Sequence, residues 1–263
     1  MTQDEALAVL KTGANVFLTG EPWSGKSYTV NTYIAWLKER GIEPAVTAST
    51  GIAATHNGGH TIHSWSGIGV KRALSEYDLD HIAQTERIVR HVRGTNILII
   101  DEVSMLSADT LSMVEAVCRE IRGNTKAFGG LQVILVGDFF QLPPISSKRE
   151  EVVEQDTLLG EEVRSLFSFA SAAWSTLNPI VCYLHEQHRQ EDEQFLGILS
   201  AIRRGEVEEG HREVLLSRKN AGKNTQSSQL FSNNDDVNQI NYAQLAKIAE
   251  PAHTFTMSGR GSE

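Results

Sequence analysis

A glycine-rich segment near the N-terminus has the composition of a phosphate-binding loop. The apolar residues 16–18 lead into Gly20, and the pattern Gly-x4-Gly-Lys-Ser then runs to Ser27, before a stretch that can form a helix. In such a loop, backbone N–H groups and the positive end of the helix surround phosphate oxygens, the lysine reaches the β- and γ-phosphates, and the serine hydroxyl binds Mg²⁺. We therefore predict that Lys26 and Ser27 bind the phosphates and metal of a nucleotide. An ordinary glycine turn is the alternative.

Two adjacent carboxylates, Asp101 and Glu102, follow the aliphatic run 97–100. Such a run is typical of a buried parallel strand, and carboxylates at its carboxyl end lie where phosphates and Mg²⁺ collect. We expect Asp101 to hold Mg²⁺ and Glu102 to act as a general base toward the attacking water. Alone, the pair would more often be a solvated turn, but a phosphate loop upstream favours the catalytic interpretation.

Two more polar side chains follow aliphatic runs. Gln141 comes after the run 131–136, in the segment GDFFQLPP, and it could hydrogen-bond the γ-phosphate or the attacking water. Arg189 comes after the run 179–184 and could stabilise charge on a transferring phosphoryl group. From spacing alone, a proline-stiffened connection and a surface arginine are the plainer interpretations of these two segments.

The segment from 49 to 69 is rich in Ser, Thr, Gly and His, which leaves two interpretations equally open. Hydroxyl and N–H donors at a strand's carboxyl end can contact a phosphate backbone, but the same residues also form long surface loops. His56, His60 and His63 suggest a metal, yet no cysteine or carboxylate nearby completes a ligand set, so a zinc site is disfavoured.

The elements that must hold these residues alternate between strand and helix. We predict five buried strands, at 16–18, 44–48, 96–100, 131–136 and 179–184, with helices at 4–12, 27–40, 78–93, 106–122, 166–174 and 195–204. This alternation predicts an α/β fold with a doubly wound parallel sheet. Between the fourth and fifth strands we predict a surface excursion at 145–164. After the last of these helices we predict a linker at 205–227, a short strand at 228–232 and a helix at 234–248.

The bulk composition excludes few functions. The chain has 263 residues, of which 40% are hydrophobic, and contains no run of 18 apolar residues. Its net charge of −9 argues against binding nucleic acid by bulk charge, although a local channel remains compatible. Cys118 and Cys182 lie in apolar segments and are expected to be buried free thiols. Since no signal peptide is apparent, we expect a cytoplasmic protein, or a nuclear or mitochondrial one in a eukaryote.

Together, six segments resemble the motifs of PIF-one/RecD-type superfamily-one DNA helicases: TGEPWSGKS, VTASTGIAA, GGHTIHSWSGIG, LIIDEVSML, VGDFFQLPP and LHEQHRQEDEQF. The resemblance covers nearly the whole chain and is most specific in its middle segments. It implies a RecA-like P-loop NTPase fold with ATP and Mg²⁺ as cofactors. It also implies 5′-to-3′ translocation on single-stranded DNA and unwinding at duplex junctions. The protein is then expected to be monomeric, to have no membrane partner, and to act in DNA repair, recombination and telomere maintenance.

The resemblance also assigns roles to individual residues. Gln141 corresponds to the γ-phosphate sensor, Arg189 to the arginine finger, and Asp101 and Glu102 to the metal-binding and water-activating pair, with Ser27 as the second metal ligand. Nucleotide contacts fall on Gln3, which matches the adenine-contacting glutamine, and on Gly20, Ser24, Gly25, Lys26, Ser27 and Tyr28. Contacts with single-stranded DNA fall on Thr50, Gly51, Thr61, His63 and Ser64.

Two departures from the family pattern affect these expectations. Pro22-Trp23-Ser24 stands where the family usually has Ala-Gly-Thr, so nucleotide affinity could differ. The family's second motor domain should extend well past residue 263, which leaves residues 1–204 as the first motor domain, 205–227 as a linker and 228–263 as the start of the second. We therefore expect this chain alone to bind nucleotide without unwinding DNA.

Two rival functions differ in class from a motor. One is a nucleotide-gated module that binds DNA or regulates a partner without productive turnover. The other is a metabolic kinase that uses the same loop, but this reading does not account for the segment 61–69 or for the glutamine-proline turn.

Overall fold

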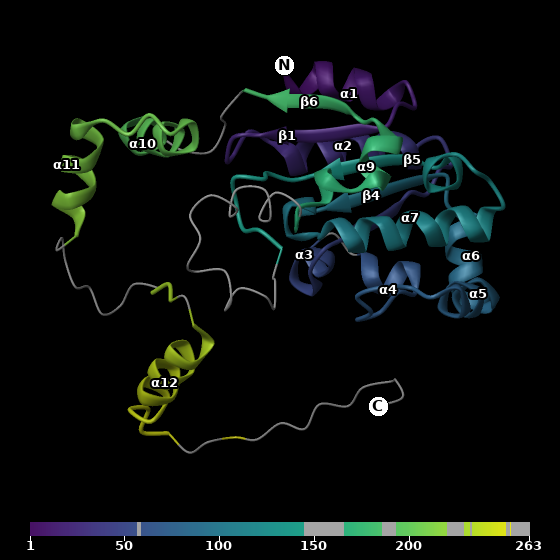
Figure 1. Ribbon diagram of the computed structural model, residues 1–263. Helices are drawn as coiled ribbons and strands as arrows, with labels where there is room; N and C mark the ends of the chain where they lie inside the picture. The colour runs from purple at the N-terminus through teal and green to yellow at the C-terminus, as the bar shows by residue number, and fades with distance from the viewer. Residues whose placement is uncertain are drawn as a thin grey trace, which may run out of the picture. The chain divides into compact units, whose positions relative to one another are not determined.

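The computed structural model describes residues 1–56, 59–144, 166–185, 193–219, 229–231, 233–250 and 253. The chain divides into two compact units, Met1–Val207 and Glu208–Glu263. The sheet and the predicted site residues that the structure describes all belong to the first unit (Figure 1). Within the described part of the chain, no helix is both long and apolar enough to cross a bilayer.

The first unit is built on a parallel sheet whose strands, among the described residues, stand in the order β3-β2-β4-β5-β1-β6. The strands are β1 (Val16–Gly20), β2 (Ala45–Ala48), β3 (His60–Thr61), β4 (Ile97–Asp101), β5 (Gln132–Val136) and β6 (Ile180–Leu184). Because all are parallel, their carboxyl ends lie along one edge of the sheet. The residues after β1, β4 and β5 are those singled out above for chemistry.

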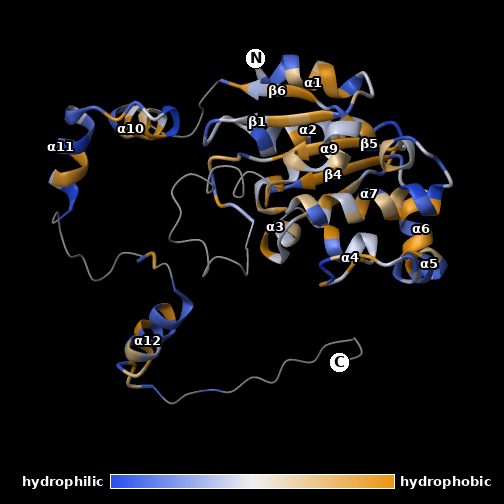
Figure 2. Ribbon diagram, viewed as in Figure 1, coloured by the Kyte–Doolittle hydropathy of each residue, from blue (hydrophilic) through white to orange (hydrophobic). Residues whose placement is uncertain are grey.

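Helices cover both faces of the sheet, which confirms the predicted doubly wound α/β fold (Figure 1). Along β1, Val16 and Leu18 pack with α1 (Gln3–Lys11) and α2 (Lys26–Lys38), whereas Phe17 packs into the core of the opposite face. That face is covered by α4 (Ile62–Ser66), α5 (Glu76–Gln84), α6 (Glu86–Gly94), α7 (Ala108–Arg122) and α9 (Ala172–Leu177). The strands form the hydrophobic layer between the helices (Figure 2), and the two free thiols are buried as predicted.

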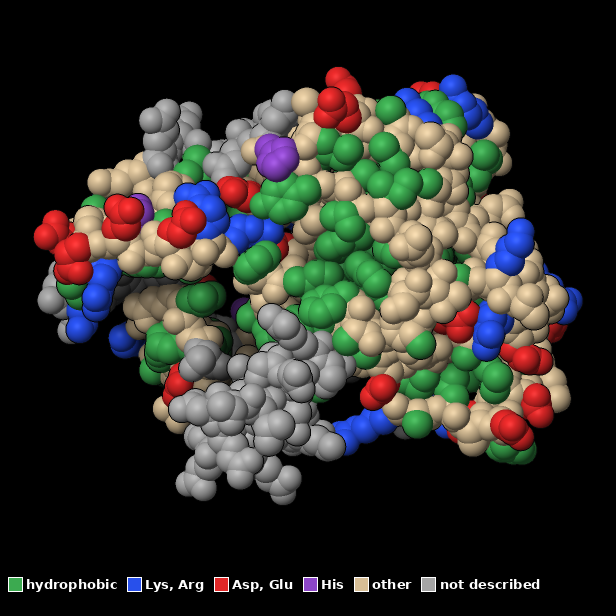
Figure 3. All heavy atoms as spheres, turned by 45° about the horizontal axis from the view of Figure 1, so that its top comes forward, with side chains coloured by type: hydrophobic (Ala, Val, Ile, Leu, Met, Phe, Trp, Pro, Cys, Tyr) green, Lys and Arg blue, Asp and Glu red, His purple; other side chains and the backbone are tan. Residues whose placement is uncertain are grey.

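Two predictions within the sheet unit were wrong in detail, and one strand was not predicted. The helix predicted at 78–93 is two helices, because Thr85 adopts an extended conformation between α5 and α6. The strand predicted at 179–184 is an edge strand, with Ile180 and Val181 50% and 60% exposed, and not a buried one. Strand β6 lies near the top of Figure 1, and Figure 3, which brings that side forward, shows hydrophobic side chains gathered there. The short strand β3 was not predicted.

Other segments also differ from the sequence-based prediction. The helix predicted at 166–174 is a 3₁₀ turn, Ser168–Ala170, followed by α9. The linker predicted at 205–227 contains α11 (Glu209–Arg218), and residues 229–231 do not form the predicted strand. The helices predicted after Phe195 and at 234–248 correspond to α10 (Glu193–Arg204) and α12 (Asn234–Leu245). The predicted surface excursion at 145–164 lies outside the described residues.

Candidate functional site

The phosphate loop connects β1 to α2, as its sequence predicted. A Cβ atom on Gly20 would lie 2.5 Å from the Leu184 carbonyl oxygen of β6, so only glycine fits where the strand ends. Gly25 has φ +85° and caps α2, a left-handed conformation that glycine adopts without strain. The Lys26 ammonium donates hydrogen bonds to the Gly20 and Glu21 carbonyl oxygens, at 3.0 and 3.1 Å. The loop therefore curls around its own lysine.

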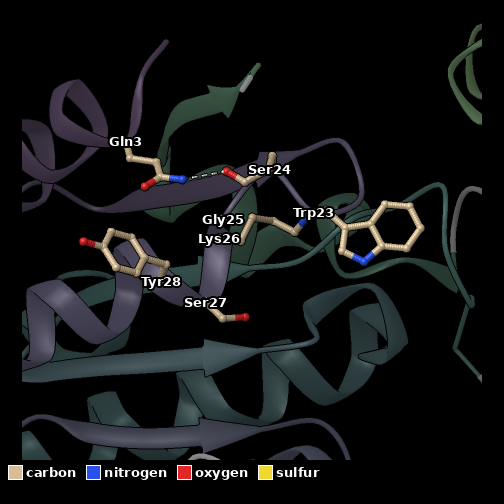
Figure 4. Close-up of a pocket in the computed structure, with 7 residues that line it drawn as sticks. All are labelled: Gln3, Trp23, Ser24, Gly25, Lys26, Ser27 and Tyr28. Carbon is tan, nitrogen blue, oxygen red and sulfur yellow. Dashed lines mark hydrogen bonds between the residues drawn. The ribbon is translucent and has the colours of Figure 1, made fainter. Parts of the chain in front are cut away.

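Helix α1 brings Gln3 to this loop. The Gln3 side-chain amide donates to the Ser24 carbonyl oxygen at 3.2 Å (Figure 4). A pocket of about 500 Å³ opens here, lined by Gln3, Trp23, Ser24, Gly25, Lys26, Ser27 and Tyr28. Six of the seven residues predicted to contact nucleotide thus line one cavity, and the seventh, Gly20, bonds to Lys26.

The acidic pair lies at the carboxyl end of β4. The Asp101 carboxylate accepts a hydrogen bond from the Glu102 backbone N–H at 2.9 Å, and Glu102 itself has φ +53°. Ser49, after β2, donates from its backbone N–H to the Asp101 carbonyl oxygen and from its hydroxyl to the Glu102 carbonyl oxygen, at 3.1 and 2.8 Å. These bonds hold the end of β2, and with it Thr50, beside the acidic pair.

A second pocket, of about 560 Å³, joins these residues to the phosphate loop. It is lined by Ser27, Thr50, Ile52, Ala53, Asp101, Glu102, Ser104, Met105, Gln141 and Leu142. Ser27 lines both pockets, so the two cavities adjoin at this residue. The structure thereby brings together four of the predicted catalytic and metal-binding residues, although they come from three different strand ends.

Burial changes the proton affinities of two charged groups in this site. It lowers the pKa of Lys26, an effect that the nearby Asp138 carboxylate opposes. Burial, and then the negative charge of Asp101, raise the pKa of Glu102. A carboxylate with a raised pKa is a stronger base, which suits a group that must accept a proton from water.

Gln141 is held by a residue that sequence reasoning did not assign. Its side-chain amide donates to the Asp138 carboxylate at 3.2 Å, and its backbone N–H donates to the Asp138 carbonyl oxygen at 2.9 Å. Asp138 is only 2% exposed and also pairs with Arg203 of α10 at 2.6 Å. Asp138 lies in the segment VGDFFQLPP, one of the six that resemble the family, so the sequence did contain a signal for this residue. No sequence pattern pointed to Arg203.

The residues predicted to contact DNA fall into two groups. Thr61, His63 and Ser64 line a third pocket, of about 610 Å³, together with Gly67, Gly69, Val70, Lys71 and Arg87. Thr61 caps α4 by accepting a hydrogen bond from the Ser64 N–H at 3.2 Å, and burial lowers the pKa of His63. Thr50 instead lines the second pocket, and the exposed Gly51 begins α3 (Gly51–His56). Sequence reasoning did not assign Lys71 and Arg87, the two basic residues that line the third pocket.

One predicted site residue, Arg189, lies outside the described residues. Among those described, no group of three or more His, Cys, Asp and Glu side chains forms a metal-binding set. The side chains of Ser27 and Asp101 carry oxygen atoms of the kind that bind Mg²⁺, a cation that commonly takes further ligands from water and substrate phosphates.

Comparison with known proteins identifies similar chains. A family model described as PIF1-like helicase matches residues 4–213. The ATP-dependent DNA helicase Pif1 of Psychrobacter sp. (strain PRwf-1) is 43% identical over 275 residues, which cover 99% of this chain and 39% of that protein. The chain thus spans about two fifths of that relative.

Solved structures agree with the sequence match. The crystal structure of Pif1 helicase from Candida albicans has a TM-score of 0.81 at 30% identity, covering 94% of this chain and 54% of the other. Pif1 helicase from Bacteroides, solved in complex with ADP-AlF3 and ssDNA, has a TM-score of 0.74 at 28% identity, covering 95% and 57%. These likenesses confirm the predicted RecA-like fold class.

Proposed function

The chain belongs to the PIF1-like helicase family, and we propose that it is the ATP-binding motor part of a DNA helicase. The observation that carries this proposal is the pair of cavities that adjoin at Ser27. One holds a phosphate loop, and the other holds a carboxylate pair and a glutamine. A loop that binds phosphates next to a group that can activate water is what nucleoside triphosphate hydrolysis requires.

Each side chain has a distinct part in this proposal. Lys26 and the loop N–H groups bind the β- and γ-phosphates. Gln3, whose amide also bonds to the loop at Ser24, contacts the adenine base. Glu102 accepts a proton from the attacking water, and Gln141 hydrogen-bonds the γ-phosphate or that water. Arg189 is proposed as the arginine finger on the strength of the motif alone.

The proposed metal is Mg²⁺, and the donor set fits it. The Ser27 hydroxyl and the Asp101 carboxylate line one pocket and supply the oxygen ligands that this cation prefers. When bound, Mg²⁺ would neutralise charge on the phosphates. Ser27 and Asp101 would hold it between the phosphate loop and the acidic pair.

The proposed nucleic acid is single-stranded DNA. Support comes from the Bacteroides relative, which was solved with ssDNA, and from the hydroxyl and basic side chains that line the third pocket. Thr61 and Ser64 would contact the DNA backbone, with Lys71 and Arg87 nearby to attract its charge. We further propose that 5′-to-3′ translocation and unwinding at junctions require two motor domains, of which residues 1–204 form the first and residues 228–263 begin the second, with 205–227 as the linker. We also propose that the chain acts as a monomer.

The test is the steady-state ATPase rate of the chain, with and without a single-stranded oligonucleotide, at low and moderate salt. Under the motor proposal, DNA stimulates turnover, the stimulation weakens as salt rises, and Lys26→Ala abolishes turnover. Nucleotide binding with no turnover under any condition would instead favour the rival, a nucleotide-gated module. A chain that binds no nucleotide would overturn both.

A further inference from the structure

Helix α10 contacts the nucleotide site at two separate places. The Arg203 side chain is 10% exposed and pairs with the almost fully buried Asp138 carboxylate at 2.6 Å. One turn earlier, the Ser200 hydroxyl donates to the Glu21 carboxylate of the phosphate loop at 2.8 Å. The motif resemblance assigns no role to either α10 residue.

The Arg203 contact leads directly to Gln141. The Asp138 oxygen that pairs with Arg203, Oδ2, is also the one that accepts the hydrogen bond of the Gln141 amide. The other oxygen, Oδ1, accepts from the Phe140 backbone N–H at 3.1 Å, which closes the turn. A single carboxylate thus holds both the backbone and the side chain of the glutamine turn, while Arg203 holds the carboxylate.

The environment of Arg203 suits an arginine in particular. Its guanidinium lies 4.3 Å from the centroid of the Phe140 ring, so it stacks on the same turn that it supports through Asp138. A planar group can pair with a carboxylate and stack on an aromatic ring at once, whereas a lysine ammonium is a point charge. Without the Arg203 cation, the buried Asp138 carboxylate would lose its ion-pair partner.

We propose that Arg203 is a positioning residue for Gln141. Through Asp138 and Phe140, Arg203 fixes the glutamine amide beside the position that the γ-phosphate of a bound nucleotide would occupy. Ser200 bonds to Glu21 of the phosphate loop, so helix α10 contacts both that loop and the glutamine turn. In this proposal, the glutamine turn is the part that distinguishes a triphosphate from a diphosphate. This inference rests on the proposed nucleotide site.

The test measures discrimination between nucleotides, which does not require turnover. Dissociation constants for ADP and for a non-hydrolysable ATP analogue are measured on the full chain, with unfolding midpoints in parallel. Arg203→Gln should lower the preference for the triphosphate by about fivefold, the value of one net hydrogen bond. Arg204→Gln is the matched control, because Arg204 is exposed and bonds only to Glu206 among the contacts described.

A double variant separates positioning from general stability. Gln141→Ala should cause the same loss of preference for the triphosphate. Adding Arg203→Gln to it should cause no further loss, because both changes remove the same interaction, that of the Gln141 amide with the γ-phosphate. Additive losses, or equal weakening of both nucleotides by Arg203→Gln, would overturn the inference. If Arg203→Gln does not fold, Arg203→Lys takes its place with a smaller loss in the same direction, and an unchanged preference overturns the inference. A wild-type chain that binds neither nucleotide would overturn the proposed function as well.

Discussion

At the scale of single residues, the end of β1 depends on the lack of a side chain at Gly20. We expect Gly20→Ala to lower the free energy of unfolding by about 1–3 kcal/mol, because its methyl group would press on the backbone oxygen of Leu184. Urea denaturation measures the change. Gly94→Ala is the control, since a Cβ there meets nothing within 4 Å, and it should leave stability unchanged or slightly raised. Equal effects of the two variants would contradict this account of the strand end.

Glu102 should cost stability where its carboxyl group is ionised. Its pKa in the folded chain lies above that of the unfolded chain, so the folded state binds protons more tightly, and stability falls as pH rises through the folded pKa. Glu102→Gln should therefore raise the unfolding midpoint at pH 7. The gain should vanish below about pH 4, where the carboxyl group is protonated in both states. The exposed Glu120→Gln serves as control, and a gain that does not depend on pH would contradict the prediction.

The residues proposed to carry chemistry could be selected from the sequence because phosphate chemistry restricts residue types. A phosphate loop needs glycines, a lysine and a serine or threonine at fixed spacing, and the carboxylate pair gains a catalytic interpretation because such a loop precedes it. Asp138 and Arg203 were not assigned, because their pairing joins positions 65 residues apart that only the fold brings together. The left-handed conformation of Trp23, at φ +61°, was equally unforeseen, because most residues other than glycine avoid it.

At the scale of elements, one arginine joins three backbone segments beside the sheet. Arg122 at the end of α7 donates to the carbonyl oxygens of Val92, Thr95 and Gly129, at 3.2, 2.8 and 2.8 Å. Arg122→Ala should lower the free energy of unfolding by about 2 kcal/mol, because these acceptors would lose charged donors. The control, Arg90→Ala, removes an exposed pair with Glu86 and should cost about 0.5 kcal/mol or less. Urea denaturation of both variants would refute the prediction if the two costs were equal.

Elements were predictable from sequence where burial alone determines them. The aliphatic runs of β1, β4 and β5 are buried on both faces and needed no further information. The two residues of β3 carry no periodicity, and they are in a strand only because β2 lies beside them. The apolar spacing of α5 and α6 is continuous across Thr85, so the break between them depends on packing that the pattern does not record.

At the scale of the whole molecule, a net charge of −9 means that any DNA contact must rely on a local basic region. Arg87 lines the third pocket, so Arg87→Ala should weaken binding of a single-stranded oligonucleotide. It should also reduce the slope of log K against log salt by about 0.7, the contribution of one phosphate contact. Arg90→Ala on the same helix is the control, because Arg90 is exposed, pairs with Glu86 and does not line the pocket. Fluorescence anisotropy across a salt series measures both variants, and equal slopes would contradict the proposed contact.

The division of the chain into two units leads to a last prediction. All described residues that line the three pockets lie within Met1–Val207, and so do the α10 contacts. A chain ending at Val207 should therefore bind an ATP analogue with the same affinity as the full chain, as measured by titration. Weaker binding would mean that residues 208–263 contribute to the nucleotide site. That result would be expected if ATP is bound between two motor domains, since residues beyond the first would then contact it directly.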